Sequence, residues 1–277
     1  MTATSYKIDK SNSNLLMNNL TREGGVRDVA RLRSLVLPHA GDWLCVTPSA
    51  ALGLHLRTVE FIVSIKYRLG IPIYSTTGQC PACRDVSDDY GDHAISCGSE
   101  GERIARHNHL RDALFQATAT AALSPSREER ALIPGSNSKP ADVLIPNWTH
   151  GKDTALDVTV VNPLQTSLVE RVARDPEPGY ALSYAFDNKL RKHGQACRSE
   201  GMVFLPVPVE SLGGWHPEAA LQVKKIGAAK ARQTGEEEDV AIAHLFQKLA
   251  VLLVRGNAAL LLNRIPSFPD PQEDGVM

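Results

Sequence analysis

KPADVLIPNWTHGKDTALDVTVV, residues 139–161, contains two short β-prone runs joined by a segment rich in Pro, Asn and Gly. This pattern predicts a β-hairpin with strands over 141–145 and 155–161. Asp142 opens the first run and Asp157 lies inside the second, with fourteen residues between them. A carboxylate in an apolar strand needs a cation or hydrogen bonds, because an isolated buried charge is strongly destabilising. We therefore expect Asp142 and Asp157 to converge on one cation.

A structural role for each of these carboxylates is the alternative. An Asp at the start of a strand commonly caps a turn with its side chain, and this alternative applies to Asp142. It applies less well to Asp157, because Leu156 and Val158 flank that residue and Thr159 follows.

The composition of the chain sets few limits on its function. Its 277 residues include 30 Lys and Arg against 31 Asp and Glu, and this length allows one large or two small domains. Near-neutral charge gives no overall attraction to nucleic acid, so any such site depends on local clustering. The N-terminus lacks the apolar run of a signal peptide, and no segment reaches about 18 consecutive apolar residues. We expect an intracellular protein without a membrane partner or a small-molecule cofactor.

Four potential metal ligands precede the hairpin, in the spacing Cys80-x2-Cys83-x9-His93-x3-Cys97. A Cys-x2-Cys turn wraps two thiolates around one cation, and the later His/Cys pair completes a tetrahedron. Four protein ligands leave no open position, so this pattern predicts a structural zinc site. The alternative is an unrelated cluster of reduced cysteines. An odd total of five cysteines argues against a disulfide framework.

Composition and periodicity divide the chain into five expected parts: a disordered N-terminus (1–24), a helical module (25–75), a zinc knuckle (76–100), an α/β domain (101–265) and a flexible tail (266–277). Trp43 and Cys45 are expected in the core of the helical module. In the α/β domain, the order helix, two strands, helix, strand, helix predicts a small mixed sheet flanked by helices.

Several segments have local predictions of their own. Helices are expected within 50–69, over 181–198 and over 238–263, and a loop over 124–142. The apolar run 202–209 contains Pro206 and Pro208, which suit an edge strand or a strand end. The acidic residues between the knuckle ligands lack the order of a calcium loop and are expected in a solvated loop: Asp85, Asp88, Asp89 and Asp92.

The predicted helix over 102–123 carries three arginines that are candidate phosphate contacts: Arg103, Arg106 and Arg111. A solvated helix face is the alternative for all three. The string His107-Asn108-His109 spells the name of the HNH nucleases, but consecutive helical residues point about 100° apart. We therefore do not interpret it as that motif.

Two carboxylates on adjacent strands suit Mg²⁺ or Mn²⁺, which prefer oxygen ligands, and Mg²⁺ retains bound water. Such a metal activates water for attack on a phosphodiester and stabilises the leaving oxygen. A nearby lysine would position the nucleophile or offset phosphate charge. Candidates for the remaining roles are Lys189 and then Lys192 as this lysine, and Glu128 or Glu129 as a third carboxylate.

Residues 80–192 resemble the C-terminal region of site-specific non-LTR retrotransposon proteins, in which a Cys/Cys/His/Cys knuckle precedes a restriction-like endonuclease of the PD-(D/E)xK type. Beyond the knuckle, the resemblance rests on three strings: Arg106-His107-Asn108, Lys139-Pro140-Ala141-Asp142 and Asp157-Val158-Thr159-Val160. It implies a restriction-endonuclease-like fold, metal binding by Asp142 and Asp157, and nicking of target DNA. It also implies contact with element RNA and a nuclear location.

The chain departs from the restriction-like pattern at two positions. Ala141 separates Pro140 from Asp142, and Thr159 occupies the position of the usual lysine, so Lys189 on the next helix is the candidate. No Tyr/Phe-x-Asp-Asp turn of a reverse transcriptase occurs in the sequence. We expect a retrotransposon-derived endonuclease without that domain. The alternatives are a catalytically inactive nucleic-acid-binding protein and a zinc-stabilised protein-interaction module.

Overall fold

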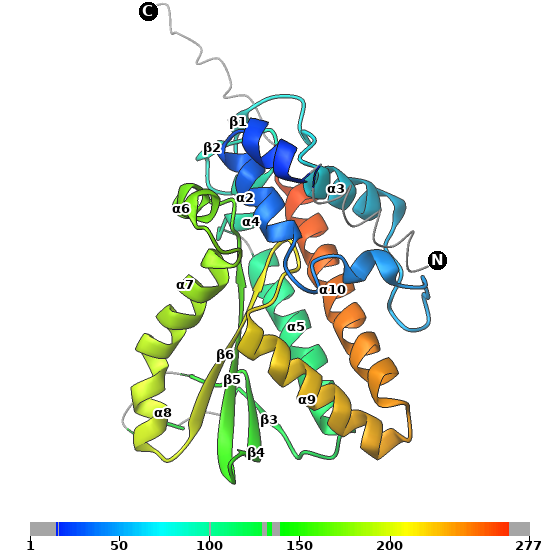
Figure 1. Cartoon of the computed structure of the whole chain (residues 1–277), viewed down its shortest axis with the longest axis vertical. Helices are drawn as coiled ribbons and strands as arrows, with labels where there is room; N and C mark the ends of the chain where they lie inside the picture. Colours follow the sequence, from blue (N-terminus) through cyan, green and yellow to red (C-terminus); the bar gives the residue numbers. More distant parts are fainter. Residues whose placement is uncertain (1–14, 16, 100, 129–131, 135–138, 266–277) are drawn as a thin grey trace, which may run out of the picture.

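The computed structural model describes residues 15, 17–99, 101–128, 132–134 and 139–265. The chain is a mixed α/β protein in which a four-stranded sheet lies between two layers of helices (Figure 1). The predicted tail lies outside the described residues, as do residues 1–14 and 16 of the predicted disordered N-terminus. Residues 17–23 of that segment are helical.

The predicted hairpin is confirmed. Strands β4 (Val143–Thr149) and β5 (Lys152–Val161) pair antiparallel, with Val143 opposite Leu156. His150 and Gly151 link them, and both have positive φ (53° and 70°), as a type I′ turn requires. Strand β5 begins three residues earlier than predicted, because this tight turn extends the ladder to the Thr149–Lys152 pair.

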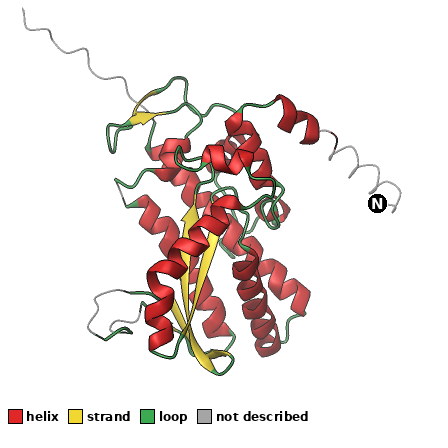
Figure 2. Cartoon of the chain, turned by 60° about the vertical axis from the view of Figure 1, so that its left-hand side comes forward, coloured by secondary structure: helices red, strands yellow, loops and turns green. Residues whose placement is uncertain are grey.

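Two further strands complete the sheet, in the order β3-β4-β5-β6. Figure 2 shows its long strands with helices on either side. The short strand β3 (Ser126–Arg127) was not predicted from the sequence, which indicates a loop there. Strand β6 (Val203–Glu210) runs parallel to β5 and forms the edge of the sheet. Pro206 and Pro208 lack a backbone N–H, and an edge strand accommodates that loss, so the predicted edge position is confirmed.

Side chains alternate across β5 and separate the two helical layers. Leu156 and Val158 pack with the layer that contains α5 (Glu102–Thr120), α9 (Pro217–Thr234) and α10 (Glu238–Asn263). Ala155 faces the other layer, which consists of α7 (Tyr180–Lys189), a π-helical turn η2 (Leu190–Gly194) and α8 (Gln195–Ser199). Helix α6 (Val169–Arg174) connects β5 to this second layer. The predicted helix over 181–198 is therefore present but contains a π turn.

The N-terminal helices pack onto the α/β part. Helix α3 (Thr58–Leu69) and the 3₁₀ turn η1 (Asp42–Cys45) contact α10, and α2 (Val26–Leu35) contacts α6. Residues from the predicted helical module, knuckle and α/β domain share one buried cluster, which includes Val63, Ile95 and Leu182. Helix α3 starts at Thr58, so the helical stretch predicted from residue 50 is shorter than expected.

Trp43 lies in the core as predicted, but the prediction for Cys45 is wrong. Cys45 is exposed at the end of η1, although the neighbouring Trp43 and Val46 pack against α10.

Helix α10 is the central helix of the larger layer. Within the described part of the chain, it is the one helix long and apolar enough to cross a membrane. Of its most apolar 18-residue window, 67% is buried inside the fold. Leu249, Leu253 and Phe246 are among the buried residues, which is the pattern of a core helix.

Replacement of the buried Glu210 tests how the stability of this fold depends on pH. Glu210 ends β6 and is fully buried, and neither carboxylate oxygen has a hydrogen-bond partner within the described part of the chain. Burial raises the pKa of Glu210 from 4.5 to about 7, against a smaller opposing effect of Ser34. The folded state therefore holds this proton more tightly, so Glu210 destabilises the fold progressively as pH rises from 4.5 through 7.

We expect Glu210→Gln to raise the melting temperature by several degrees at about pH 8, and by much less at about pH 5. Thermal unfolding followed by circular dichroism measures this difference. Glu218→Gln, on the exposed start of α9, is the control and should change neither value. Equal stabilisation by Glu210→Gln at both pH values would contradict the assignment.

Candidate functional site

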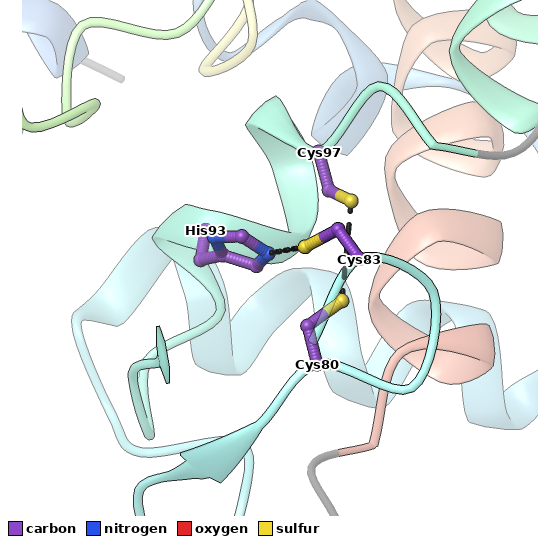
Figure 3. A group of neighbouring side chains, drawn as sticks. All are labelled: Cys80, Cys83, His93 and Cys97. Atoms are coloured by element: carbon purple, nitrogen blue, oxygen red, sulfur yellow. Dashed lines mark hydrogen bonds between the residues drawn. The ribbon is translucent and has the colours of Figure 1, made fainter. Parts of the chain in front are cut away.

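The four predicted zinc ligands come together in a compact cluster (Figure 3). Cys80 and Cys83 belong to the turn between β1 (Gly78–Gln79) and β2 (Val86–Ser87), whereas His93 lies on the short helix α4 (Asp92–Ser96) and Cys97 follows it. All four ligand atoms lie within 4.8 Å of one another. This is the one such group of three or more His, Cys, Asp or Glu side chains among the described residues.

The spacing and chemistry of this cluster fit a tetrahedral cation. Zn–S bonds of about 2.3 Å in a tetrahedron place two sulfurs about 3.8 Å apart. The Cys80 and Cys97 sulfurs are 3.9 Å apart, and Cys83 Sγ is 3.2 Å from His93 Nε2. Burial and the adjacent thiols raise the pKa of Cys83 to about 11, so the cluster holds three thiolates readily only around a cation. The cluster can therefore hold a metal such as zinc.

A buried arginine lies beside this cluster. Arg264, at the end of α10, is fully buried and donates from Nη2 to Glu102 Oε2 at 2.9 Å. Burial opposes ionisation of Cys97, but hydrogen bonds from Ser99 and Arg264 outweigh it and lower the pKa of Cys97 to about 6. Three thiolates with one divalent cation leave a net negative charge, which the Arg264 guanidinium offsets.

Two acidic residues of the knuckle, Asp88 and Asp92, make contacts within the fold that the sequence does not predict. Asp88 accepts hydrogen bonds from the backbone amides of Tyr90, Asp92 and His93 and so shapes the turn into α4. The Asp92 carboxylate pairs with Arg27 of α2, with Oδ1 3.0 Å from Nη2. These contacts correct the prediction that this segment is a solvated loop.

The two hairpin carboxylates also lie side by side. Asp142 immediately precedes β4, and its Oδ2 accepts a 2.7 Å hydrogen bond from the backbone N–H of Val158 on β5. Asp157, in the middle of β5, is only 7% exposed and faces α7. The hydrogen bond from Val158 is the local contact that a structural carboxylate makes. The Asp142 side chain makes this contact and still lies next to Asp157.

Lys189 supplies the counter-charge for Asp157. It is the last residue of α7, and its Nζ lies 3.0 Å from Oδ1 and 2.9 Å from Oδ2 of Asp157. Burial raises the pKa of Asp157 to about 6 against the opposing effect of Lys189, and the nearby Asp142 adds to the rise. The π-helical turn begins at the next residue, and such turns frequently mark functional positions.

His107 is the site residue that the sequence did not reveal. It projects from α5, and its Nε2 lies 3.1 Å from Asp142 Oδ1. The only sequence signal was its place in the Arg106-His107-Asn108 string, since histidine on a helix has no distinctive spacing. The structure therefore joins four side chains from α5, the two arms of the hairpin and α7: His107, Asp142, Asp157 and Lys189.

Other predicted site residues are placed elsewhere. The Glu128 carboxylate pairs with Arg111 and lies 3.6 Å from Lys139, while its backbone N–H donates to the Asp142 carbonyl at 3.2 Å. Glu129 lies outside the described residues. Arg106 is 4% exposed and donates to Asn257 Oδ1 at 2.7 Å. Burial and internal partners thus correct the phosphate-contact prediction for Arg106 and Arg111, because both guanidinium groups stabilise the fold.

A cleft lies between α5 and α7 beside this group of four. It consists of two adjoining hollows of about 350 and 360 Å³ that share Arg103, Arg106, Thr159, Val160 and Lys189. Lys192 lines the first hollow and His107 the second, and the described residues of both linings include no Asp or Glu. We call it the basic cleft.

The zinc knuckle forms one wall of the basic cleft. Ile95 and Ser96 line the first hollow and Gly98 lines the second. Arg103 Nη1 donates to the Ser96 carbonyl at 2.9 Å, which ties this exposed arginine to the knuckle. The fold of the knuckle therefore helps to determine the shape of the cleft.

Asn162 connects the knuckle to the end of β5. Its Nδ2 donates to the Asp92 carbonyl and to Ser96 Oγ, at 3.1 and 2.9 Å. Its Oδ1 accepts from the Tyr67 and Ser211 hydroxyl groups at 3.3 and 3.0 Å. A single buried amide thus holds α4, β5 and α3 together.

Comparison with known proteins does not assign the chain to a family. No protein-family model matches it, and no curated protein matches it at a significant level. The residues of the chain therefore carry the functional conclusion by themselves.

Replacement of one knuckle cysteine tests the metal site. We expect Cys80→Ser to remove bound zinc and to lower the melting temperature, because a serine hydroxyl is a poor zinc ligand at neutral pH. Metal content measured by mass spectrometry on the purified protein should fall from about one zinc per chain to nearly none. Cys45→Ser, an exposed thiol outside the cluster, is the matched control. Retention of zinc by Cys80→Ser would contradict the ligand assignment.

Proposed function

We propose that this chain is a metal-dependent endonuclease that hydrolyses phosphodiester bonds of DNA. The observation that carries the proposal is the meeting of Asp142, Asp157 and Lys189 beside a cleft whose described lining residues include several cations and no carboxylate. A carboxylate pair attracts a divalent cation, while the basic lining favours a phosphate chain. This combination is the one that nicking of DNA requires.

The sheet supports a restriction-endonuclease-like fold. Three antiparallel strands are followed by a helical crossover to a fourth strand parallel to β5. Asp142 lies at the start of one central strand and Asp157 within the next, as the resemblance to the retrotransposon nucleases requires. A nuclear location and contact with element RNA follow from that resemblance and are part of the proposal.

The donor set fits Mg²⁺ or Mn²⁺. Asp142 and Asp157 lie next to each other on the hairpin, Lys189 balances the charge of Asp157, and two carboxylates leave room for the waters that Mg²⁺ retains. Asp142 and Asp157 would hold the ion, which when bound supplies an activated water and neutralises the leaving oxygen. Zinc in the knuckle would be structural, because four protein ligands leave no open position.

The remaining side chains act on the substrate. Lys189 would exchange its contact with Asp157 for the scissile phosphate, a short movement for a flexible ammonium side chain. Arg103 and Lys192 are exposed on the cleft and would contact neighbouring phosphates. His107 would orient the Asp142 carboxylate through its Nε2 contact.

Binding of nucleic acid without cleavage is the second candidate. One observation favours it: the Lys189 ammonium contacts both oxygens of Asp157 and so occupies the carboxylate that a metal needs. A protein in which this ion pair persists would bind phosphates with strong salt dependence and cleave none.

Nicking of supercoiled plasmid separates the two candidates. We expect nicking with Mg²⁺ or Mn²⁺, and a loss of at least about 100-fold in Asp157→Asn and in Lys189→Met, because each change removes charge stabilisation at the reacting phosphate. Asp187→Asn, an exposed acid on α7, is the matched control and should keep full activity.

Undiminished nicking by Asp157→Asn would place the metal elsewhere. Absence of nicking by the folded, zinc-loaded protein, together with salt-dependent DNA binding, would establish the binding-only function.

A further inference from the structure

One surface formed by α7 and the π-helical turn η2 combines an aromatic ring, an amide and a cation. Tyr184 and Asn188 lie four residues apart on α7, which places them on one face of that helix. Lys192 follows on η2, and all three side chains line the first hollow of the basic cleft. Neither the zinc cluster nor the proposed cleavage chemistry uses this row.

Tyr184 is an exposed aromatic ring on a rigid support. It is 40% exposed, and its ring stacks on that of Tyr180 with centroids 6.4 Å apart and an interplanar angle of 15°. Tyr180 in turn accepts a 3.3 Å hydrogen bond from Arg171. An exposed ring held in this way at the rim of a basic hollow is a platform on which a nucleobase can stack.

The polar groups around this ring match the rest of a nucleotide. Arg103 and Lys192 have no acidic partner among the described residues, so their charges are available to phosphates. Asn188 uses its oxygen to accept from Arg191, which leaves its NH₂ group as a donor. Gln165 also lines the hollow and offers both a donor and an acceptor.

We propose that the Tyr184 hollow binds an unpaired nucleotide, with its base stacked on Tyr184 and its phosphates on Lys192 and Arg103. The proposal rests on the proposed nuclease function and specifies its substrate as a nucleic acid with a single-stranded nucleotide beside the cleaved bond. A base inside a duplex is covered on both faces by its neighbours, so it can stack on Tyr184 only when it leaves the duplex. A volume of about 350 Å³ lies within the usual range of small-ligand pockets.

Equilibrium binding without added divalent metal tests this site apart from cleavage. The probes are a short fluorescent oligothymidylate and a chain of the same length that carries abasic sugars only, followed by fluorescence anisotropy. We expect Tyr184→Ala to weaken binding of oligothymidylate roughly tenfold or more, because stacking on an aromatic side chain is lost. Tyr184→Phe keeps the ring and should bind nearly as the unmodified protein does.

The abasic chain identifies the partner of the ring. We expect the unmodified protein to bind the abasic chain about as weakly as Tyr184→Ala binds oligothymidylate. We also expect Tyr184→Ala and the unmodified protein to bind the abasic chain equally well. Equal losses on both chains would show that Tyr184 acts on something other than a base and would overturn the proposal.

The salt dependence tests the phosphate contact separately. Lys192→Gln should lower the slope of log affinity against log salt by about 0.7, the value for one phosphate contact on a single strand. Lys225→Gln, an exposed lysine on α9 outside the cleft, is the matched control. An unchanged slope in Lys192→Gln would remove Lys192 from the site and overturn this part of the proposal.

Binding of DNA and RNA versions of the probe shows whether the site takes a nucleotide of DNA, of RNA or of both. Tyr184-dependent binding of either supports the site, and binding of neither overturns it. The result is readable even when the protein cleaves nothing, because no divalent metal is added. Conversely, normal plasmid nicking together with unaltered binding by Tyr184→Ala would leave the nuclease function standing and remove this inference alone.

Discussion

The buried carboxylate of Asp157 imposes the main constraint on this structure. It lies in an interior strand of a four-stranded sheet, where an unpaired charge would be strongly destabilising. The helix that crosses from β5 to β6 answers this constraint by placing Lys189 within 3.0 Å of it. Three features of the structure adjoin this one ion pair. They are the position of α7 over the sheet, the π-helical turn after Lys189 and the basic cleft between α5 and α7.

The zinc knuckle and the sheet form a connected unit. Asn162 links the knuckle helix α4 to the end of β5, five residues beyond Asp157, and Arg103 is held by a knuckle carbonyl. A cation in the Cys3His cluster would therefore stabilise one wall of the cleft as well as its own loop. This connection gives a physical reason for a zinc knuckle to stand directly before the α/β part of the chain.

Local sequence patterns predicted much of the fold. The hairpin followed from two β-prone runs around a segment rich in Pro, Asn and Gly, and the edge position of β6 followed from Pro206 and Pro208. Strand β3 was not predicted because a strand of two residues shows no periodicity. The exposure of Cys45 was not predicted because composition does not show where a turn meets the surface. Arg106 and Arg111 were misassigned because arginines on a helix look alike in sequence, whether they face solvent or Asn257 and Glu128.

The sequence by itself identified the four knuckle ligands from their spacing and the two hairpin aspartates from their strand context, whereas Lys189 followed from the resemblance to the retrotransposon nucleases. Only the tertiary structure decided that His107 meets Asp142, that Asn162 joins the knuckle to the sheet, and that Tyr184 borders the cleft. Short-range patterns report the conformation and burial of a segment, because these depend on neighbouring residues. The contacts of His107 with Asp142 and of Lys189 with Asp157 join residues 35 and 32 positions apart, so they arise only when the helices pack on the sheet.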